Sequence, residues 1–102
     1  MNQSIKEGFW HSDLEPYYPF PVVQVTPVSK EFCKKLVLVQ NNLAQKYGYF
    51  GASVCRICNC SNGCLEYTYG NYVWPEGFLH YLENHNIYPS EHFYNFINNL
   101  IT

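Results

Sequence analysis

The amino-acid sequence predicts one small domain of the α+β class. Hydrophobic residues make up 47% of the 102 residues and charged residues only 14%, which excludes intrinsic disorder and predicts a packed core. Three segments start with a residue that is typical of the N-terminus of a helix, and they carry apolar residues at helical spacing. Two short β-prone runs flank a Gly-Asn turn between the first and second of these segments, which adds a β-hairpin. About three helices and one hairpin, in separate stretches of a chain this short, are typical of a single α+β domain.

Residues 1–28 are expected to form an extended arm. Three prolines between Glu15 and Pro21 fix φ and favour extended conformations in the residues that precede them. The arm is also rich in aromatic side chains, which favours packing on the domain over the alternative, a flexible tail. These aromatic residues are Trp10, Tyr17, Tyr18 and Phe20.

Residues 29–52 are expected to supply the first helix. Ser29 can cap a helix that begins at Lys30 and continues to about residue 46, and Gly48 and Gly51 stop it. The lysines of this helix are expected to lie on its solvent-exposed face. One face carries apolar residues at three- and four-residue intervals, namely Phe32, Leu36, Val39, Leu43 and Tyr47.

Residues 53–102 are expected to contain the hairpin and two further helices. The β-prone runs 65–69 and 72–74 flank Gly70-Asn71. Pro75 suits the first turn of the second helix, which should end near residues 84–86. The last helix is capped by Ser90 and has an apolar face of Phe93, Phe96, Ile97 and Leu100.

Two cysteines and two histidines have the spacing of a structural zinc site. Cys55 and Cys58 are separated by two residues, and His80 and His85 by four, in the pattern C-x2-C-x21-H-x4-H. These gaps let the two pairs bind the same tetrahedral ion, and the predicted hairpin accounts for the long segment between the pairs. Two thiolates and two neutral imidazoles leave Zn²⁺ with no net charge, so the site can be buried.

The two histidines require the second helix to end at a particular place. Positions 80 and 85 differ by about 500° of rotation on a regular helix, so the two rings would not share one face. The helix should therefore close just before His85, and Asn84 and Asn86 favour such an ending.

Several alternatives remain for these side chains. Cys60 or Cys64 can replace a histidine in the ligand set, and Cys55 and Cys58 can instead be small buried hydrophobic residues. A redox-active pair is a third interpretation, because Arg56 would lower the pKa of a neighbouring thiol. However, a redox motif should open a helix, whereas residues 59–63 indicate a turn. His11 and His92 are expected to be exposed or locally bonded histidines and not ligands.

An enzyme is not expected. A zinc deaminase has a Glu two residues after its ligand histidine and a Pro before its CxxC pair. Here Leu82 lies two residues after His80, and Val54 precedes Cys55. Hydrolytic zinc chemistry therefore has little support.

A resemblance to a known family covers most of the chain and is strongest over residues 53–89. It is carried by SVCRIC at 53–58, NG at 62–63, WPEG at 74–77, and HY at 80–81 followed by His85. These motifs resemble those of small, largely uncharacterised bacterial zinc-binding proteins with a CRIC…NGS-E…WPEGxxHYxxxH pattern. The resemblance implies zinc ligation by the same four residues and no particular activity. The chain departs from the pattern at Cys60 and Cys64, where Gly and Ser are expected, so extra ligands remain open.

Composition and charge bear on partners and location. The net charge is −2, which gives no overall attraction to nucleic acid. No apolar run is long enough to span a membrane and no signal peptide is recognisable, so a cytoplasmic protein with reduced cysteines is expected. The abundance of aromatic residues favours a role in binding another protein, and the alternative is that the tyrosine rings lie half-buried with their hydroxyls in solvent. Nucleic acid is the alternative partner, because the two cysteines and two histidines resemble a zinc finger and the basic residues all lie between Lys6 and Arg56.

Overall fold

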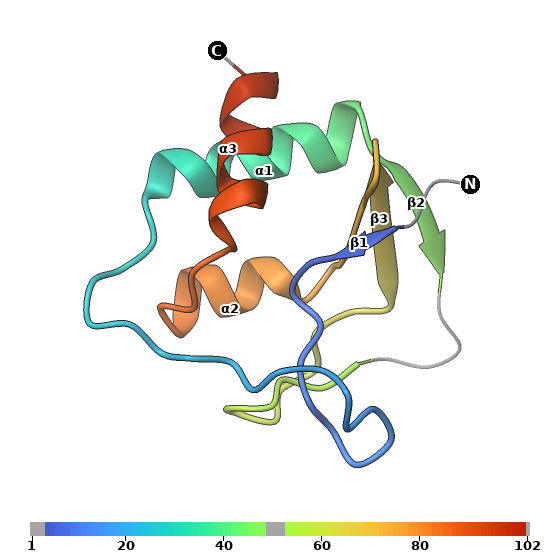
Figure 1. The fold of residues 1–102 in the computed structure, drawn as a ribbon, viewed down its shortest axis with the longest axis vertical. Helices are drawn as coiled ribbons and strands as arrows, with labels where there is room; N and C mark the ends of the chain where they lie inside the picture. Colours follow the sequence, from blue (N-terminus) through green and yellow to red (C-terminus); the bar gives the residue numbers. More distant parts are fainter. Residues whose placement is uncertain (1–3, 49–52, 102) are drawn as a thin grey trace.

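Three helices pack against one face of a four-stranded sheet in the computed structural model, which describes residues 4–48 and 53–101 (Figure 1). The helices cross one another on the side of the sheet that carries the core, and this arrangement confirms the α+β class. In chain order the elements are β1 (Ile5–Lys6), α1 (Lys30–Asn42), β2 (Gln45–Gly48), β3 (Leu65–Tyr69), β4 (Tyr72–Pro75), α2 (Phe78–Asn84) and α3 (Glu91–Leu100).

The sheet is built around the predicted hairpin. Strands β3 and β4 pair in antiparallel fashion and are joined at Gly70, whose φ of +59° is a conformation that glycine adopts without strain. Two strands that the sequence did not predict extend the sheet to the order β1-β4-β3-β2. The first of them, β1, belongs to the arm and lies parallel to β4, with Ile5 opposite Tyr72.

The first helix is shorter than predicted. It ends at Asn42 instead of about residue 46, and Gln45–Gly48 forms β2 against β3. The apolar stripe is correct through Val39, but Leu43 and Tyr47 are exposed. As a strand, this segment forms hydrogen bonds with the backbone groups along the edge of β3. These bonds join distant parts of the chain, so the helical spacing of the local sequence cannot reveal them.

Pro75 also lies elsewhere than predicted. It is the last residue of β4, paired with Glu66, and α2 begins only at Phe78. Proline has no backbone N–H to donate, so it fits the end of a ladder as well as the first turn of a helix.

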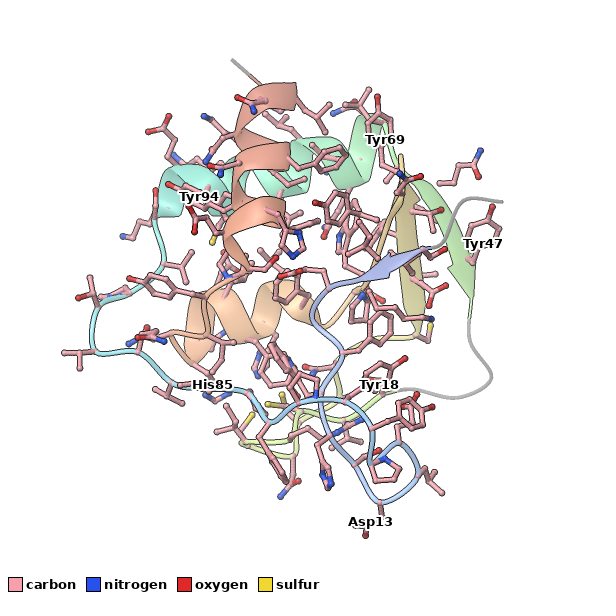
Figure 2. The ribbon with its side chains drawn as sticks, in the orientation of Figure 1. Asp13, Tyr18, Tyr47, Tyr69, His85 and Tyr94 are labelled. Atoms are coloured by element: carbon pink, nitrogen blue, oxygen red, sulfur yellow. The ribbon has the colours of Figure 1, made fainter. Side chains whose placement is uncertain are left out.

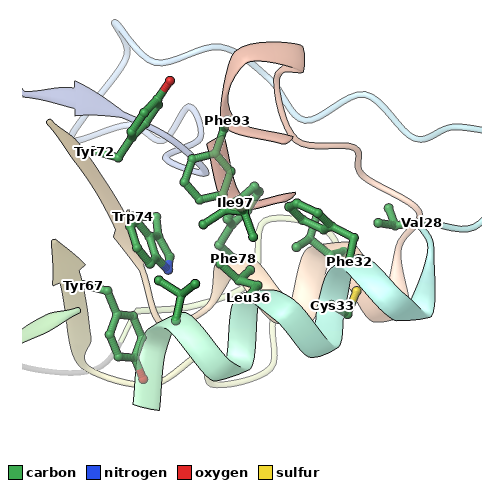
Figure 3. Packing of buried hydrophobic residues seen from close by; sticks show 12 residues of the cluster. Val28, Phe32, Cys33, Leu36, Tyr67, Tyr72, Trp74, Phe78, Phe93 and Ile97 are labelled. Carbon is green, nitrogen blue, oxygen red and sulfur yellow. The ribbon is translucent and has the colours of Figure 1, made fainter. Parts of the chain in front are cut away.

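The core is a largely aromatic cluster between the hairpin and the helices α1, α2 and α3 (Figure 3). Trp74 is fully buried, with the rings of Tyr67 and Phe93 centred 6.0 and 5.3 Å from its own. Its indole Nε1 donates to Oε1 of buried Gln40, at 3.0 Å. A buried N–H is costly without an acceptor, so this hydrogen bond explains why a glutamine occupies the buried face of α1.

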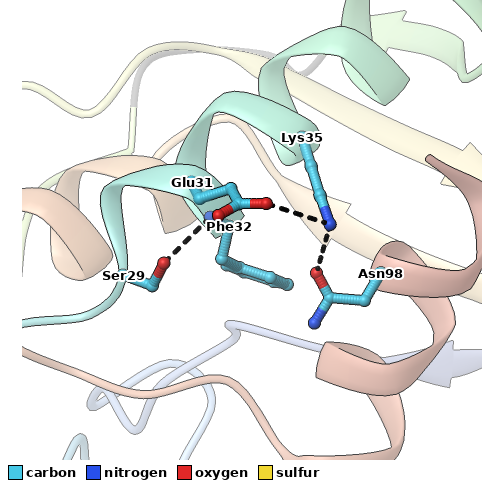
Figure 4. Close-up of polar contacts among 5 residues, drawn as sticks. All are labelled: Ser29, Glu31, Phe32, Lys35 and Asn98. Carbon is cyan, nitrogen blue, oxygen red and sulfur yellow. Dashed lines mark hydrogen bonds and ion pairs between the residues drawn. The ribbon is translucent and has the colours of Figure 1, made fainter. Parts of the chain in front are cut away.

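The predicted caps are present on both long helices. Oγ of Ser29 accepts from the backbone N–H of Phe32, and Ser90 does the same for Phe93. Lys35 then joins the two helices, since its Nζ donates to Oδ1 of Asn98 on α3 and lies 3.6 Å from a Glu31 carboxylate oxygen (Figure 4).

The arm is anchored at both ends and looped in the middle, so it is extended only in part. Near its start, the buried carboxylate of Glu7 accepts two hydrogen bonds of 2.7 Å, from the backbone N–H and the hydroxyl of Ser90. Near its end, Val23 forms a bridge with Ile87. Between them the chain turns back on itself below α2, and His11 N–H donates to the carbonyl of Pro19 (Figure 1).

Packing within the arm is uneven. Trp10 contacts both buried clusters, whereas Tyr17 and Phe20 are 73% and 67% exposed. The docking predicted for the aromatic residues is therefore correct for Trp10 and wrong for these two. Within the described residues, no helix has the length and apolar character needed to cross a bilayer.

Candidate metal centre

Residues 53–63 fold into a tight loop that presents two cysteine sulfurs. Backbone hydrogen bonds join Cys55 to Cys60 and Ser53 to Gly63, and Val54 pairs with Ser61. Asn59 has a φ of +62°, which asparagine tolerates better than most residues and which lets the chain reverse after Cys58. The C-x2-C motif thus lies at the tip of a short antiparallel turn.

The loop backbone points its N–H groups at these sulfurs. The N–H groups of Ile57 and Cys58 both approach Cys55 Sγ, at 3.4 Å. Such N–H groups stabilise negative charge on sulfur, the form in which cysteine binds a metal. The turn is therefore organised for thiolates before any ion is considered.

Helix α2 supplies the two histidines, and it ends at the place that the sequence predicted. The helix closes at Asn84 with His85 as its C-terminal cap, and Asn86 follows with a left-handed φ of +52°. This ending turns the His85 ring back toward the cysteine loop, and Figure 2 shows His85 between α2 and that loop. His80 projects from the first turn of the same helix, and Asn84 Nδ2, one turn later, lies 3.3 Å from its Nδ1.

The structure brings together all four predicted ligands. One ligand atom each from Cys55, Cys58, His80 and His85 lies within 4.8 Å of every other. The His80 and His85 Nε2 atoms are 3.2 Å apart. Cys55 Sγ is 3.5 Å from His85 Nε2, and Cys58 Sγ is 3.3 Å from His80 Nε2.

These separations fit a tetrahedral zinc ion. With ordinary Zn–N and Zn–S bond lengths, two nitrogens lie about 3.3 Å apart, and a sulfur and a nitrogen about 3.6 Å apart. The three separations agree to within a few tenths of an ångström. Two thiolates and two imidazoles in this geometry form a donor set that suits zinc.

The four ligands differ in exposure. Cys55 is fully buried against Tyr81 and Ile87, the two histidines are half-buried, and Cys58 is exposed. The pKa of Cys58 is lowered to about 5, first by the backbone N–H of Cys60 and then by the Cys60, His85 and His80 side chains. The hydrogen bond between the Cys58 and Cys60 sulfurs raises the pKa of Cys60.

Tyr81 fastens the cysteine loop to α2. Its ring is buried beside Cys55, and its hydroxyl accepts from the backbone N–H of Arg56 at 2.7 Å. Burial raises the pKa of Tyr81 to about 12, and the Arg56 N–H opposes that rise. The hydroxyl therefore stays protonated, and the hydrogen bond fixes the first cysteine next to the helix that supplies both histidines.

Glu76 fastens the other side of the loop, and the sequence interpretation did not assign it a role. Its Oε1 accepts from the backbone N–H groups of Cys64 and Leu65, at 3.0 and 3.2 Å. Gly63 and Gly77 allow this packing, since a Cβ at Gly63 would overlap the Glu76 carboxylate and one at Gly77 would overlap Asn62. The NG and WPEG motifs contained the sequence signal for this contact. They place two glycines, which allow close packing, beside side chains that can form hydrogen bonds with the backbone.

The remaining candidates lie outside this set of four. His11 stacks on Phe20, with ring centroids 4.1 Å apart, and His92 Nδ1 lies 2.9 Å from the Tyr72 hydroxyl. The side chain of Arg56 donates to the carbonyls of His11 and Val54, which leaves the redox interpretation without its activating contact. Cys64 is exposed, whereas Cys60 lies next to the ligands.

Comparison of the chain with known protein families, with curated proteins and with solved structures found no match. The resemblance to bacterial zinc-binding proteins therefore stays a prediction. The four-residue Cys2His2 group, which could hold a metal ion, is thus defined by the geometry of this chain alone.

Proposed function

We propose that this protein is a zinc-stabilised interaction module that holds one Zn²⁺ through Cys55, Cys58, His80 and His85. The observation that carries the proposal is the set of four donor atoms within 4.8 Å of one another. Bound zinc would join the cysteine loop to α2, two segments that are far apart in the sequence.

A structural role is favoured over a catalytic one. A catalytic zinc keeps one coordination position open for water or substrate, whereas here four protein side chains complete a tetrahedron. Cys55 and its neighbours Tyr81 and Ile87 are also buried, which shields that side of the site from solvent. The metal would thus fix the cysteine loop against α2.

The exposed part of the arm supports a protein partner. Leu14 and Val25 are 91% and 99% exposed, and Tyr17, Phe20 and Val22 between them are each more than half exposed. Apolar side chains gathered on one surface segment are typical of contact sites for other proteins. Nucleic acid is less favoured, because α2 contains neither Lys nor Arg with which to reach phosphates or bases.

Metal content tests the zinc site. Protein purified without chelator should contain one equivalent of zinc by elemental analysis, and Co²⁺ exchanged into the site should give the absorption spectrum of a tetrahedral site with thiolate ligands. Cys55→Ser should abolish binding, whereas the matched substitution Cys64→Ser should retain it. Well-folded protein with much less than one equivalent would contradict the proposal.

The partner is tested by cross-linking in cells of the native host with the wild type and a Leu14→Ser, Val25→Ser variant. Both substitutions are on the surface, so the variant should fold and bind zinc normally. A specific cross-linked protein that is lost in the variant would support the interaction role. Salt-dependent retardation of nucleic acid by the wild type, with no such cross-link, would instead support the alternative.

A further inference from the structure

A fifth donor, Cys60, lies beside the four ligands. Its Sγ is 3.3 Å from His80 Nε2, the same separation as that between Cys58 Sγ and this nitrogen. Cys60 Sγ is also 3.3 Å from Cys58 Sγ. The exposed sulfurs of Cys58 and Cys60 are thus equally far from His80 Nε2, although only Cys58 belongs to the set of four.

The position of Cys60 is set by the loop backbone. Its carbonyl accepts from the backbone N–H of Cys55, at 2.9 Å, in the hydrogen bond that closes the C-x2-C turn. The backbone of Cys60 is therefore held beside the site by the same turn that positions Cys55. A further contact of this sulfur is long, 4.0 Å, to Asn62 Oδ1.

We propose that Cys60 is a reserve ligand that can replace His80, so that the ion is held by Cys55, Cys58, Cys60 and His85. This inference rests on the proposed zinc site. His80 is the ligand to be replaced because its Nε2 contacts Cys60, whereas Cys55 is buried in the loop and His85 Nε2 lies against Cys55. On exchange, the Cys60 thiol loses its proton to solvent, an S–metal bond forms, and the metal–Nε2 bond of His80 breaks.

The two ligand sets would suit different ions. Three thiolates and one imidazole give a divalent ion a site charge of −1, and the exposure of Cys58 and Cys60 lets water stabilise that charge. Thiolates are soft ligands, so the second set favours softer ions than zinc. We therefore expect Cd²⁺ to recruit Cys60 even in the unmodified protein, and zinc to recruit it when His80 is removed.

Zinc binding by four proteins tests the exchange: the wild type, His80→Ala, His80→Ala with Cys60→Ser, and His80→Ala with Cys64→Ser as the matched control. The single variant and the control should each keep one equivalent of zinc, and the Cys60 double variant should lose it. Loss of zinc from His80→Ala, or its retention in the Cys60 double variant, would overturn the inference. Absence of zinc from the wild type would instead overturn the proposed zinc site itself.

A second measurement leaves all four ligands of the first set in place, so it does not depend on the folding of a ligand variant. Titration with Cd²⁺ gives a near-ultraviolet charge-transfer band whose intensity rises with the number of bound thiolates. Cys60→Ser should lower this band by about a third relative to the wild type, because one of three soft ligands is lost, while Cys64→Ser should leave it unchanged. An unchanged band in Cys60→Ser would contradict the recruitment of Cys60.

Discussion

Cys58 shows how a single exposed side chain can be prepared for metal binding by its surroundings. It is exposed, yet the Cys60 N–H and two imidazoles converge on its sulfur and lower its pKa to about 5. Spacing alone identified Cys58 as a ligand, because C-x2-C is a local pattern. The N–H groups that prepare its thiolate follow from the backbone path of the loop, which spacing does not contain.

This leads to a prediction about the reduced, metal-free protein. The folded pKa of Cys58, about 5, lies below the ordinary thiol value of 9.0. The stability that its thiolate contributes should therefore be fully present above pH 9 and disappear as the pH falls through 5. Alkylation by iodoacetamide, followed by peptide mass spectrometry between pH 4 and 10, should give a midpoint for Cys58 near the lower value. The same residue in denaturant is the control, and equal midpoints in both states would contradict the prediction.

Gln40 is a residue whose role only the structure reveals. Its Oε1 is the acceptor for the buried indole N–H of Trp74, so Gln40→Leu should leave that donor unpaired. Urea unfolding should show that Gln40→Leu lowers the free energy of unfolding by about 1–3 kcal/mol. Gln45→Leu is the matched control, because the Gln45 side chain is exposed and its hydrogen bond is to the Tyr47 hydroxyl at the surface. Equal effects of the two substitutions would show that the hydrogen bond is unimportant.

At the scale of elements, local signals predicted the hairpin, the two serine caps and the end of α2. They failed where a distant partner decides the conformation. Residues 45–48 continue a helical pattern in the sequence, yet they pair with β3, and Ile5–Lys6 forms a strand only because β4 lies beside it. Short segments with mixed patterns follow their tertiary partners, which the local sequence does not specify.

The arm allows a comparison between one docked and one exposed aromatic residue. Trp10 packs edge-on against Tyr81, with ring centroids 5.9 Å apart, so it supports the second helix near the site. Trp10→Ala should lower the free energy of unfolding by about 2–3 kcal/mol, somewhat less than for a fully buried ring. Tyr17→Ala should change it by no more than about 0.5 kcal/mol. Urea unfolding of the zinc-loaded proteins measures both, and similar losses would mean that the arm packs differently.

At the scale of the whole molecule, the buried residues form two clusters of unequal size. The larger joins the hairpin and all three helices without any metal ligand, and the smaller consists of Cys55, Tyr81 and Ile87. The sequence predicted that zinc helps to hold the domain together. The structure refines this expectation, because the large cluster packs without the metal.

Removal of zinc should therefore loosen one part of the molecule first. Zinc at one hundred times its dissociation constant stabilises the protein by about 2.7 kcal/mol, and a chelator abolishes this contribution. Hydrogen exchange should speed up most at residues 53–64 and 79–87, while the amides of α1 stay protected. Cys55→Ser, already without zinc, should show no further change with chelator. Uniform acceleration along the chain would mean that the metal holds the entire domain.

The contact between Glu7 and Ser90 also orders the events of folding. It joins residues 83 positions apart, and β1 likewise waits for β4, so the start of the chain has no partner until nearly all of the chain is available. Closing so large a loop carries an entropic cost that local hairpin and helix formation do not. During synthesis, which is slow compared with helix formation, the aromatic arm would leave the ribosome before its partners in the domain and dock after them. Its apolar side chains are thus exposed for longest in the nascent chain, when binding by a chaperone would matter most.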